Sequence, residues 1–163
     1  GREETMSTIQ LDFTARKRFG LTYIDSSGQE NNEVFVIHRA PLSTHERFMA
    51  FLIEYYAGSF PVWLSPVQVA VLPISDNQND WAEKVYEELK TEGIRVEINK
   101  NNESLGKKIR GAQLQKIPYM LIIGEKEEKS KKVSERGRSG KDYGQISVEK
   151  FIENIKKEIS SKA

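Results

Sequence analysis

Cysteine is absent from the 163 residues of this chain. That absence excludes disulfide scaffolds, thiol catalysis and any zinc site completed by the chain's own cysteines. Long apolar runs are also missing, since none approaches the roughly 20 residues that a membrane-spanning helix needs, and no membrane partner is expected. The opening residues, 1–10, lack the basic and then apolar order of a secretory signal peptide. A cytoplasmic protein is therefore expected.

Net charge is nearly absent as well, at +1. The balance hides an asymmetry, because residues 100–141 hold twelve Lys and Arg against five Glu, which is +7 and leaves −6 for the remainder. A basic stripe on an otherwise acidic protein is the usual electrostatic footprint of a partner with a phosphate backbone. A solvated, lysine-rich surface loop is the alternative that charge alone leaves open.

The first part of the chain has the pattern of short strands joined by turns. Residues 9–13 alternate apolar and polar side chains, as a half-buried strand does, and residues 21–24 form a second candidate. Residues 34–37 are continuously apolar, which predicts a third strand buried on both faces. Strands this close together in sequence favour an antiparallel meander.

A helix is predicted after these strands. Ser43 and Glu46 have the spacing of a capping box, in which a hydroxyl and a carboxylate satisfy backbone N–H groups. Gly58 supplies a C-terminal stop, and two prolines within residues 60–66 then interrupt the pattern. We therefore predict two domains, residues 1–64 and residues 65–163.

The second part alternates strands and helices, which predicts an α/β fold. Such a β-α-β-α-β-β-α order favours a mostly parallel sheet that is covered by helices. The predicted strands are 67–71, 94–98 and 119–123, the helices are 77–92 and 105–116, a polar hairpin covers 125–145, and a last helix begins at Ser147.

Both histidines of the chain lie in the stretch 36–48, where the third strand leads into the helix. His38 follows the apolar run, so its imidazole is expected to face a cleft at the end of the strand. Arg47 falls in the first turn of the helix, where backbone N–H groups favour anions, and its planar guanidinium suits a phosphate. A nucleotide phosphate site is one interpretation. The other is that Arg47 pairs with a carboxylate and His38 is a hydrogen-bonded core residue.

Several segments in collinear order closely resemble the bacterial-type threonyl-tRNA synthetases. The resemblance covers essentially the whole chain, which makes chance similarity untenable. The matching segments are TIQLDF at 8–13, IHRA at 37–40, HERF at 45–48, LIEYYAG and FPVWLSPVQV within 52–69, NNESLGKKIR at 101–110, IPYMLIIGEKE at 117–127 and GKDYGQISVEKFI at 140–152.

The resemblance implies a function for each part. Residues 1–64 resemble the end of a class II synthetase catalytic domain, with an antiparallel sheet and the third family motif, and residues 65–163 resemble the anticodon-binding domain. Members of the family activate threonine with ATP and Mg²⁺ and transfer it to tRNA(Thr), and the whole enzyme is expected to be a homodimer. They also use a Zn²⁺ held by one Cys and two His, which takes the amino and hydroxyl groups of threonine.

Individual residues of this chain match residues that have defined roles in the family. His38 matches the last zinc ligand, and neutral imidazole is a common ligand of that metal. Arg47 matches the arginine that contacts the ATP phosphates and stabilises the charge of the adenylation step. Gln10 and Thr8 match polar residues that line the adenylate and the tRNA terminus, and Thr44 falls where the family presents a hydroxyl near the substrate.

In the second part, Asn102, Arg110, Glu127 and Arg136 match positions that read anticodon bases. An amide, carboxylate or guanidinium can read the splayed bases of a single-stranded loop. The alternatives are a helix cap for Asn102, an exposed helix charge for Arg110 and a surface salt bridge for Glu127. The lysines expected to attract phosphates are Lys107, Lys108, Lys131, Lys132 and Lys141.

The whole chain resembles only the last part of the family's sequences. The first two class II motifs and the other two zinc ligands are absent, so the isolated chain is expected not to aminoacylate, and a C-terminal portion of a longer enzyme is the favoured interpretation. A non-catalytic nucleic-acid-binding paralogue is the alternative, and a class II synthetase for proline, histidine or glycine is a third. His38 and Arg47 favour the enzyme over the paralogue, because a purely binding protein needs neither residue, and the zinc-type His38 in IHRA speaks against the other synthetases.

Overall fold

The computed structural model describes residue 3 and residues 5–162. Contacts divide the chain into two units, Gly1–Tyr55 and Tyr56–Ala163. Among the described residues no helix is long and apolar enough to cross a membrane.

The first unit contains two separate antiparallel strand pairs. β1 (Thr8–Asp12) pairs with β4 (Val36–Ala40), and Gln10 lies opposite His38. Between them in sequence come α1 (Ala15–Phe19) and a short hairpin, made of β2 (Tyr23–Ile24) and β3 (Glu30–Asn31). The predicted meander is therefore wrong in its pairing, because the hairpin is inserted between two strands that pair with each other.

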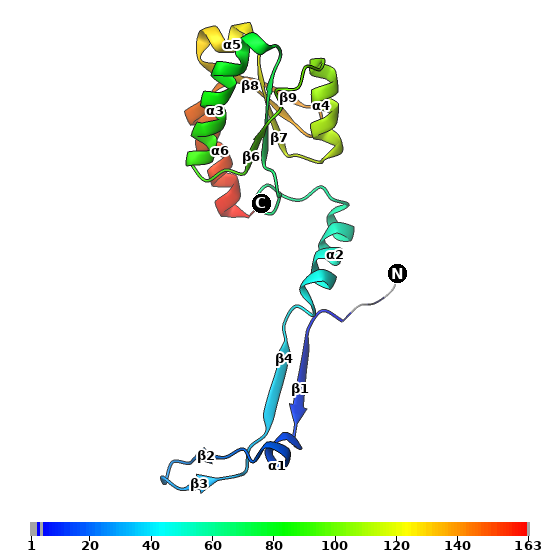
Figure 1. Ribbon diagram of the computed structural model, residues 1–163, viewed down its shortest axis with the longest axis vertical. Coiled ribbons are helices and arrows are strands. Elements are labelled where there is room, and N and C mark those ends of the chain that lie inside the picture. The colour runs from blue at the N-terminus through cyan, green and yellow to red at the C-terminus, as the bar shows by residue number, and fades with distance from the viewer. Residues whose placement is uncertain (1–2, 4, 163) are drawn as a thin grey trace. The chain divides into compact units, whose positions relative to one another are not determined.

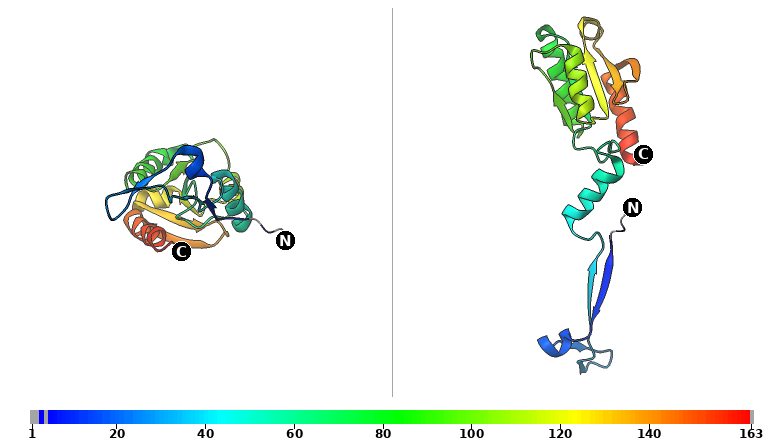
Figure 2. Two further views of the ribbon diagram at one scale, coloured as in Figure 1. Left: turned by 90° about the horizontal axis from the view of Figure 1, so that it is seen from below. Right: turned by 90° about the vertical axis from the view of Figure 1, so that its right-hand side faces the viewer.

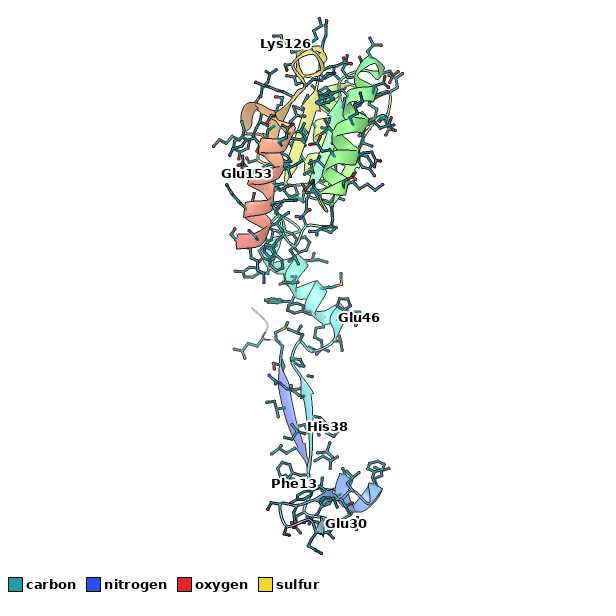
Figure 3. All side chains as sticks on the ribbon, turned by 90° about the vertical axis from the view of Figure 1, so that its left-hand side faces the viewer. Phe13, Glu30, His38, Glu46, Lys126 and Glu153 are labelled. Carbon is teal, nitrogen blue, oxygen red and sulfur yellow. The ribbon has the colours of Figure 1, made fainter. Side chains whose placement is uncertain are left out.

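The β1–β4 pair has one polar and one apolar face, since side chains alternate along a strand. The apolar face includes Ile9, Phe13 and Ile37, which are 66%, 63% and 58% exposed. Figure 3 marks Phe13 and His38 on this part of the chain. The prediction of a strand buried on both faces is wrong here, because Ala15 is the one fully buried residue that the structure describes in this unit. The apolar run therefore indicates an exposed apolar surface of the β1–β4 pair that needs another protein surface packed against it.

Helix α2 (His45–Tyr56) begins one residue later than the predicted capping box requires. Ser43 has φ of 57°, in the left-handed region, whereas a capping residue needs extended backbone. The Thr44 hydroxyl accepts a hydrogen bond from the backbone N–H of Arg47 at 3.3 Å. Thr44 is therefore the cap, and the prediction for Ser43 is wrong.

The second unit is built on a five-stranded sheet with the order β6-β5-β7-β8-β9. β5 is parallel to β6 and β7, whereas β7–β8 and β8–β9 are antiparallel. The predicted α/β fold is confirmed, but a mostly parallel sheet is wrong because half of its pairings are antiparallel. The strands are β5 (Val69–Pro73), β6 (Val96–Ile98), β7 (Tyr119–Ile123), β8 (Lys132–Gly137) and β9 (Asp142–Ser147).

Helices cover the two faces of this sheet unequally (Figure 1). The 3-10 turn η1 (Asp76–Gln78), α3 (Asn79–Thr91) and α6 (Val148–Ser161) lie on one face, and α4 (Leu105–Leu114) covers the other. α5 (Glu125–Ser130) lies at the end of the sheet, and it was not predicted because its residues are polar. Figure 2 shows β8 and β9 beside α6. Ser147, predicted at the start of the last helix, does cap it by accepting from the Lys150 N–H, and Ser104 caps α4 by accepting from the Lys107 N–H.

Hydrogen bonds join residues 62–65 to Gln68 and Arg95 within the second unit. The Gln68 side chain donates to the Val62 carbonyl at 2.9 Å, and Arg95 donates to the carbonyls of Ser65 and Trp63, both at 2.8 Å. The contact-based division therefore falls at Tyr55 and Tyr56, upstream of the domain boundary predicted at 64 and 65.

Candidate nucleic-acid interface

α4 leaves part of its face of the sheet open. Its apolar side packs on Ala70, Leu72 and Met120, which belong to β5 and β7. The next strands carry polar side chains on the same face, because paired residues share a face. Arg136 lies opposite Met120, Ser134 opposite Ile122, and Gln145 opposite Ser134. We call this surface, defined by Ser134, Arg136 and Gln145, the open face.

One flank of α4 borders the open face. Gln113 donates a hydrogen bond from its side chain to the Arg138 carbonyl, just beyond β8, at 3.3 Å. Residues three apart in a helix are neighbours on its surface, so Arg110 lies on the same flank as Gln113. Arg110 is exposed, and a side chain added at Gly106, a further turn back, would meet nothing within 4 Å. This flank is therefore accessible and positively charged.

Glu127 closes the same face at the carboxyl end of β7. One carboxylate oxygen accepts from the backbone N–H of Gly124 at 3.0 Å, and the other accepts from Gln145 Nε2 at 2.6 Å. Burial opposes its ionisation, but the hydrogen bonds from Gln145 and from backbone N–H groups outweigh burial and lower the pKa of Glu127. Glu127 is therefore an ionised acceptor, and the surface salt bridge considered as its alternative is absent among the described residues.

Arg136 follows an irregularity in the β8–β9 pairing, between Glu135 and Arg136. Such bulges re-aim side chains. The Nε atom of Arg136 is buried and has no hydrogen-bond partner within the described part of the chain. An unpaired buried donor costs free energy, and nothing among the described residues offsets that cost at this N–H.

Asn102 lies in the loop before α4 and is exposed. Ser104 caps that helix through its side chain, at 3.4 Å from Lys107 N, so the alternative role of Asn102 as the cap is wrong. Asn102 and Glu127 both lie near the carboxyl ends of the parallel strands. Asn102 precedes α4, whose residue Lys108 reaches Pro73 at the end of β5. Glu127 belongs to α5, which follows β7 directly.

The lysines predicted to contact phosphates differ in exposure. Lys108 is only 4% exposed, and its ammonium donates to the Pro73 carbonyl at 2.8 Å, so its predicted phosphate contact is wrong. Lys107, the next residue, is 70% exposed at its side chain and pairs with Glu103 at 2.8 Å. Adjacent helical residues point in different directions, and the sequence KK does not reveal which one faces the core. Lys131 and Lys141 lie over the rings of Trp81 and Tyr143.

The residues predicted for catalysis and metal binding lie in the first unit. Thr8, Gln10 and His38 share the polar face of the β1–β4 pair. His38 has a side chain that is 57% exposed, and its Nε2 lies 3.6 Å from an Asp12 carboxylate oxygen. It is therefore an exposed residue within β4, neither the strand's end nor a core residue.

The Asp12 carboxylate beside His38 is itself held in place. Hydrogen bonds from the Thr14 hydroxyl and then from backbone N–H groups lower the pKa of Asp12. In the described part of the chain no three His, Cys, Asp or Glu residues gather as metal ligands. His38 with its carboxylate neighbour fits a single imidazole ligand that a neighbouring carboxylate helps to orient.

Thr44 and Arg47 lie at the start of α2. The Thr44 hydroxyl already caps the helix by accepting from the Arg47 N–H at 3.3 Å. The Arg47 side chain is exposed, and no carboxylate of the described residues lies within ion-pair distance of it, so the carboxylate-paired alternative is not supported.

Sequence reasoning missed Ser134 and Gln145 of the open face, and it missed Gln113 on the flank of α4 that borders this face. The alternation in residues 132–137 places Ser134 and Arg136 on one side of a strand, which was a usable signal. No such signal exists in the sequence for Gln145, because the position of this residue depends on the β8–β9 register and on helix α5, which was not predicted.

The alternation of strands and helices on this mixed sheet is the architecture of an anticodon binding domain. The chain belongs to the anticodon binding domain family, whose model matches residues 68–158.

Its relatives are threonine–tRNA ligases, as the resemblance predicted. The chain is 52% identical over 162 residues to the threonine–tRNA ligase of Clostridium botulinum (strain Hall) and 47% identical to that of strain Eklund 17B. In both cases the match covers 99% of this chain and 25% of the relative. The chain thus spans about a quarter of the length of these relatives.

Solved structures agree on the fold. The RNA binding domain of threonyl-tRNA synthetase from Cryptosporidium parvum Iowa II has a TM-score of 0.83 and 36% identity, and the match covers 96% of this chain and 40% of that one. A prolyl-tRNA synthetase from Cryptosporidium parvum, complexed with halofuginone and AMPPNP, has a TM-score of 0.72 at 19% identity over 96% of this chain and 33% of that one. That second likeness concerns the fold alone.

Proposed function

We propose that this chain is the C-terminal portion of a threonine–tRNA ligase and that its second unit binds the anticodon loop of tRNA(Thr) across the open face. The observation that carries the proposal is the convergence of Arg110, Glu127 and Arg136 from three separate elements around one uncovered surface. A fixed anionic acceptor and two guanidinium donors are the groups that read base edges in a single-stranded loop.

Each residue has a distinct role in this proposal. Arg136 donates from its guanidinium to an acceptor on a base or phosphate, and Glu127 accepts from base N–H groups. Arg110 approaches from the flank of α4, and Asn102 contacts the loop from the segment before that helix. The exposed lysines Lys132 and Lys141 add attraction that does not depend on sequence, whereas Lys131 lies over Trp81 of α3.

For the first unit we propose a share of an ATP-dependent aminoacylation site. His38 supplies one of three Zn²⁺ ligands, and the others come from outside this chain. When bound, zinc acts as a Lewis acid that holds the amino and hydroxyl groups of threonine. Arg47 binds the phosphates of Mg²⁺-bound ATP, while Thr8, Gln10 and Thr44 line the adenylate and the tRNA terminus. The isolated chain is not expected to aminoacylate, and the homodimer belongs to the whole enzyme.

Fluorescence anisotropy tests the tRNA-binding proposal. A labelled stem-loop with a threonine anticodon is compared with the same stem-loop carrying swapped anticodon bases, at low and moderate salt. We expect a preference of roughly tenfold or more for the threonine loop. The preference should be lost in Arg110→Ala and kept in Lys84→Ala, which removes a positive charge from α3 on the other face. Equal, salt-sensitive binding of both loops would contradict the proposal.

A further inference from the structure

We propose that Gln145 is a specificity-determining residue of the open face, because it fixes the Glu127 carboxylate in one orientation and presents its own amide to the same nucleotide base. The ligand is a base of a single-stranded RNA loop whose edge carries N–H donors. This inference rests on the proposed anticodon-loop binding of the second unit.

The Glu127 carboxylate is held from two directions. The Gly124 backbone N–H holds one oxygen at 3.0 Å, and Gln145 Nε2 holds the other at 2.6 Å. These donors come from the start of α5 and from β9, so the carboxylate plane cannot rotate without breaking a hydrogen bond. Ordering exposed side chains costs conformational entropy, and Gln145 is exposed. An exposed pair of this kind contributes little to folding, and its main consequence is the fixed orientation of the Glu127 carboxylate.

Hydrogen-bonding capacity remains after these two contacts. A carboxylate has about four acceptor positions, and two of those on Glu127 are used by Gly124 and Gln145. The Gln145 amide keeps one N–H and its carbonyl oxygen without a partner in the described part of the chain. Together the two side chains present several adjacent acceptors and one donor. A base edge with N–H donors is complementary to this pattern.

Two glycines keep the surroundings of this pair clear. A side chain at Gly124 would come within 2.8 Å of Ile74 Cδ1 and 3.0 Å of Glu127 Oε2, so glycine leaves both side-chain ends in place without any shift. Gly144 precedes Gln145 with φ of 84°, in the left-handed region, and nothing lies within 4 Å of an added side chain there. The space beside Gln145 is therefore open.

The opposing interpretation is that the Gln145–Glu127 hydrogen bond only ties α5 to β9. A purely structural tie would lower the stability of the chain and weaken both stem-loops equally. A positioning role instead changes the ratio of the two affinities at constant stability. The two roles are therefore separable by measurement.

The test uses the 163-residue chain with Gln145→Met, which keeps the length of the side chain but removes its donor, and Glu127→Gln, which removes the negative charge. Affinity for the threonine and swapped stem-loops is measured by anisotropy, with thermal unfolding as a second readout. We expect Gln145→Met to reduce the ratio of the two affinities roughly tenfold, as does Glu127→Gln, and the double variant to lose little more. Gln115→Met, at an exposed residue beyond α4, is the matched control and should change neither readout.

Three results overturn the inference. If the unsubstituted chain shows no preference between stem-loops, the proposed function fails and this inference fails with it. If the unsubstituted chain has a preference and Gln145→Met retains it, the inference alone is wrong. If Gln145→Met weakens both stem-loops equally and lowers the unfolding temperature, Gln145 is only a structural tie.

Discussion

Replacing Gln68 by leucine tests the hydrogen bonds that fasten residues 62–65 within the second unit. Gln68 is 1% exposed, and its amide joins two segments. Its Nε2 donates to the Val62 carbonyl at 2.9 Å, and its Oε1 accepts from the Arg95 backbone N–H at 2.9 Å. Leucine has a similar volume but neither a donor nor an acceptor. Gln68→Leu therefore leaves both partners without this amide while it disturbs packing little.

The size of the effect follows from the two partners. A buried donor or acceptor left unsatisfied costs about 1–3 kcal/mol. The Arg95 N–H loses its side-chain acceptor, whereas the Val62 carbonyl retains longer hydrogen bonds from the Ser65 N–H at 3.3 Å and from Arg95 Nη2 at 3.5 Å. A full penalty for the Arg95 N–H and a partial penalty for the Val62 carbonyl together give an expected loss of about 2–4 kcal/mol in the free energy of unfolding.

Urea unfolding of the 163-residue chain measures this loss. Tryptophan fluorescence is a suitable signal, because Trp63 and Trp81 both lie in the second unit. Gln115→Leu is the matched control at an exposed position and should change stability by less than about 0.5 kcal/mol. If Gln68→Leu is as stable as this control, the buried amide does not fasten residues 62–65 and the reasoning is refuted.

Three further predictions concern single residues of the second unit. Lys108→Met should leave the slope of log affinity for RNA against log salt unchanged, because its ammonium is bound to the Pro73 carbonyl; a lysine that contacts a phosphate would lower the slope by about 0.7. Ser147→Ala removes the cap of α6 and should lower the free energy of unfolding by about 1 kcal/mol in urea, and an unchanged midpoint would contradict that role. Burial and then the nearby Glu158 carboxylate raise the pKa of Glu135. Ionised Glu135 therefore destabilises the folded state above its folded pKa, and the cost vanishes below the unfolded pKa. Glu135→Gln should raise the unfolding midpoint at about pH 7 and have no effect at about pH 3.5, below the usual pKa of glutamate; an equal gain at both pH values would show that charge is not the cause.

Elements with a strong local signal were predicted well. The strand Tyr119–Ile123 matches the prediction in full, because a continuously apolar run lies between Pro118 and Gly124. The last helix begins after Ser147 as expected, since capping serine and apolar periodicity agree there. In both cases short-range chemistry alone decides the structure.

Features that depend on distant parts of the chain were not predictable. α5, with the sequence EKEEKS, lacks apolar periodicity, so its polar residues look like those of a loop. The pairing of β1 with β4 spans an inserted hairpin that local patterns do not reveal. The apolar run at 34–37 indicated burial, but the surface that would cover it is not supplied by the described residues. Positions such as Lys108 and Gln145 are decided by helix rotation and strand register.

The central claim is that the second unit binds the anticodon loop through the open face, and an NMR titration tests it directly. The ¹⁵N-labelled 18.7 kDa chain is titrated with the threonine anticodon stem-loop, and backbone amide shifts are followed. The account predicts that the changes concentrate at Arg110 and its flank of α4, in β8 and β9, and at Glu127. Changes confined to α3 and α6, on the opposite face of the sheet, would contradict it.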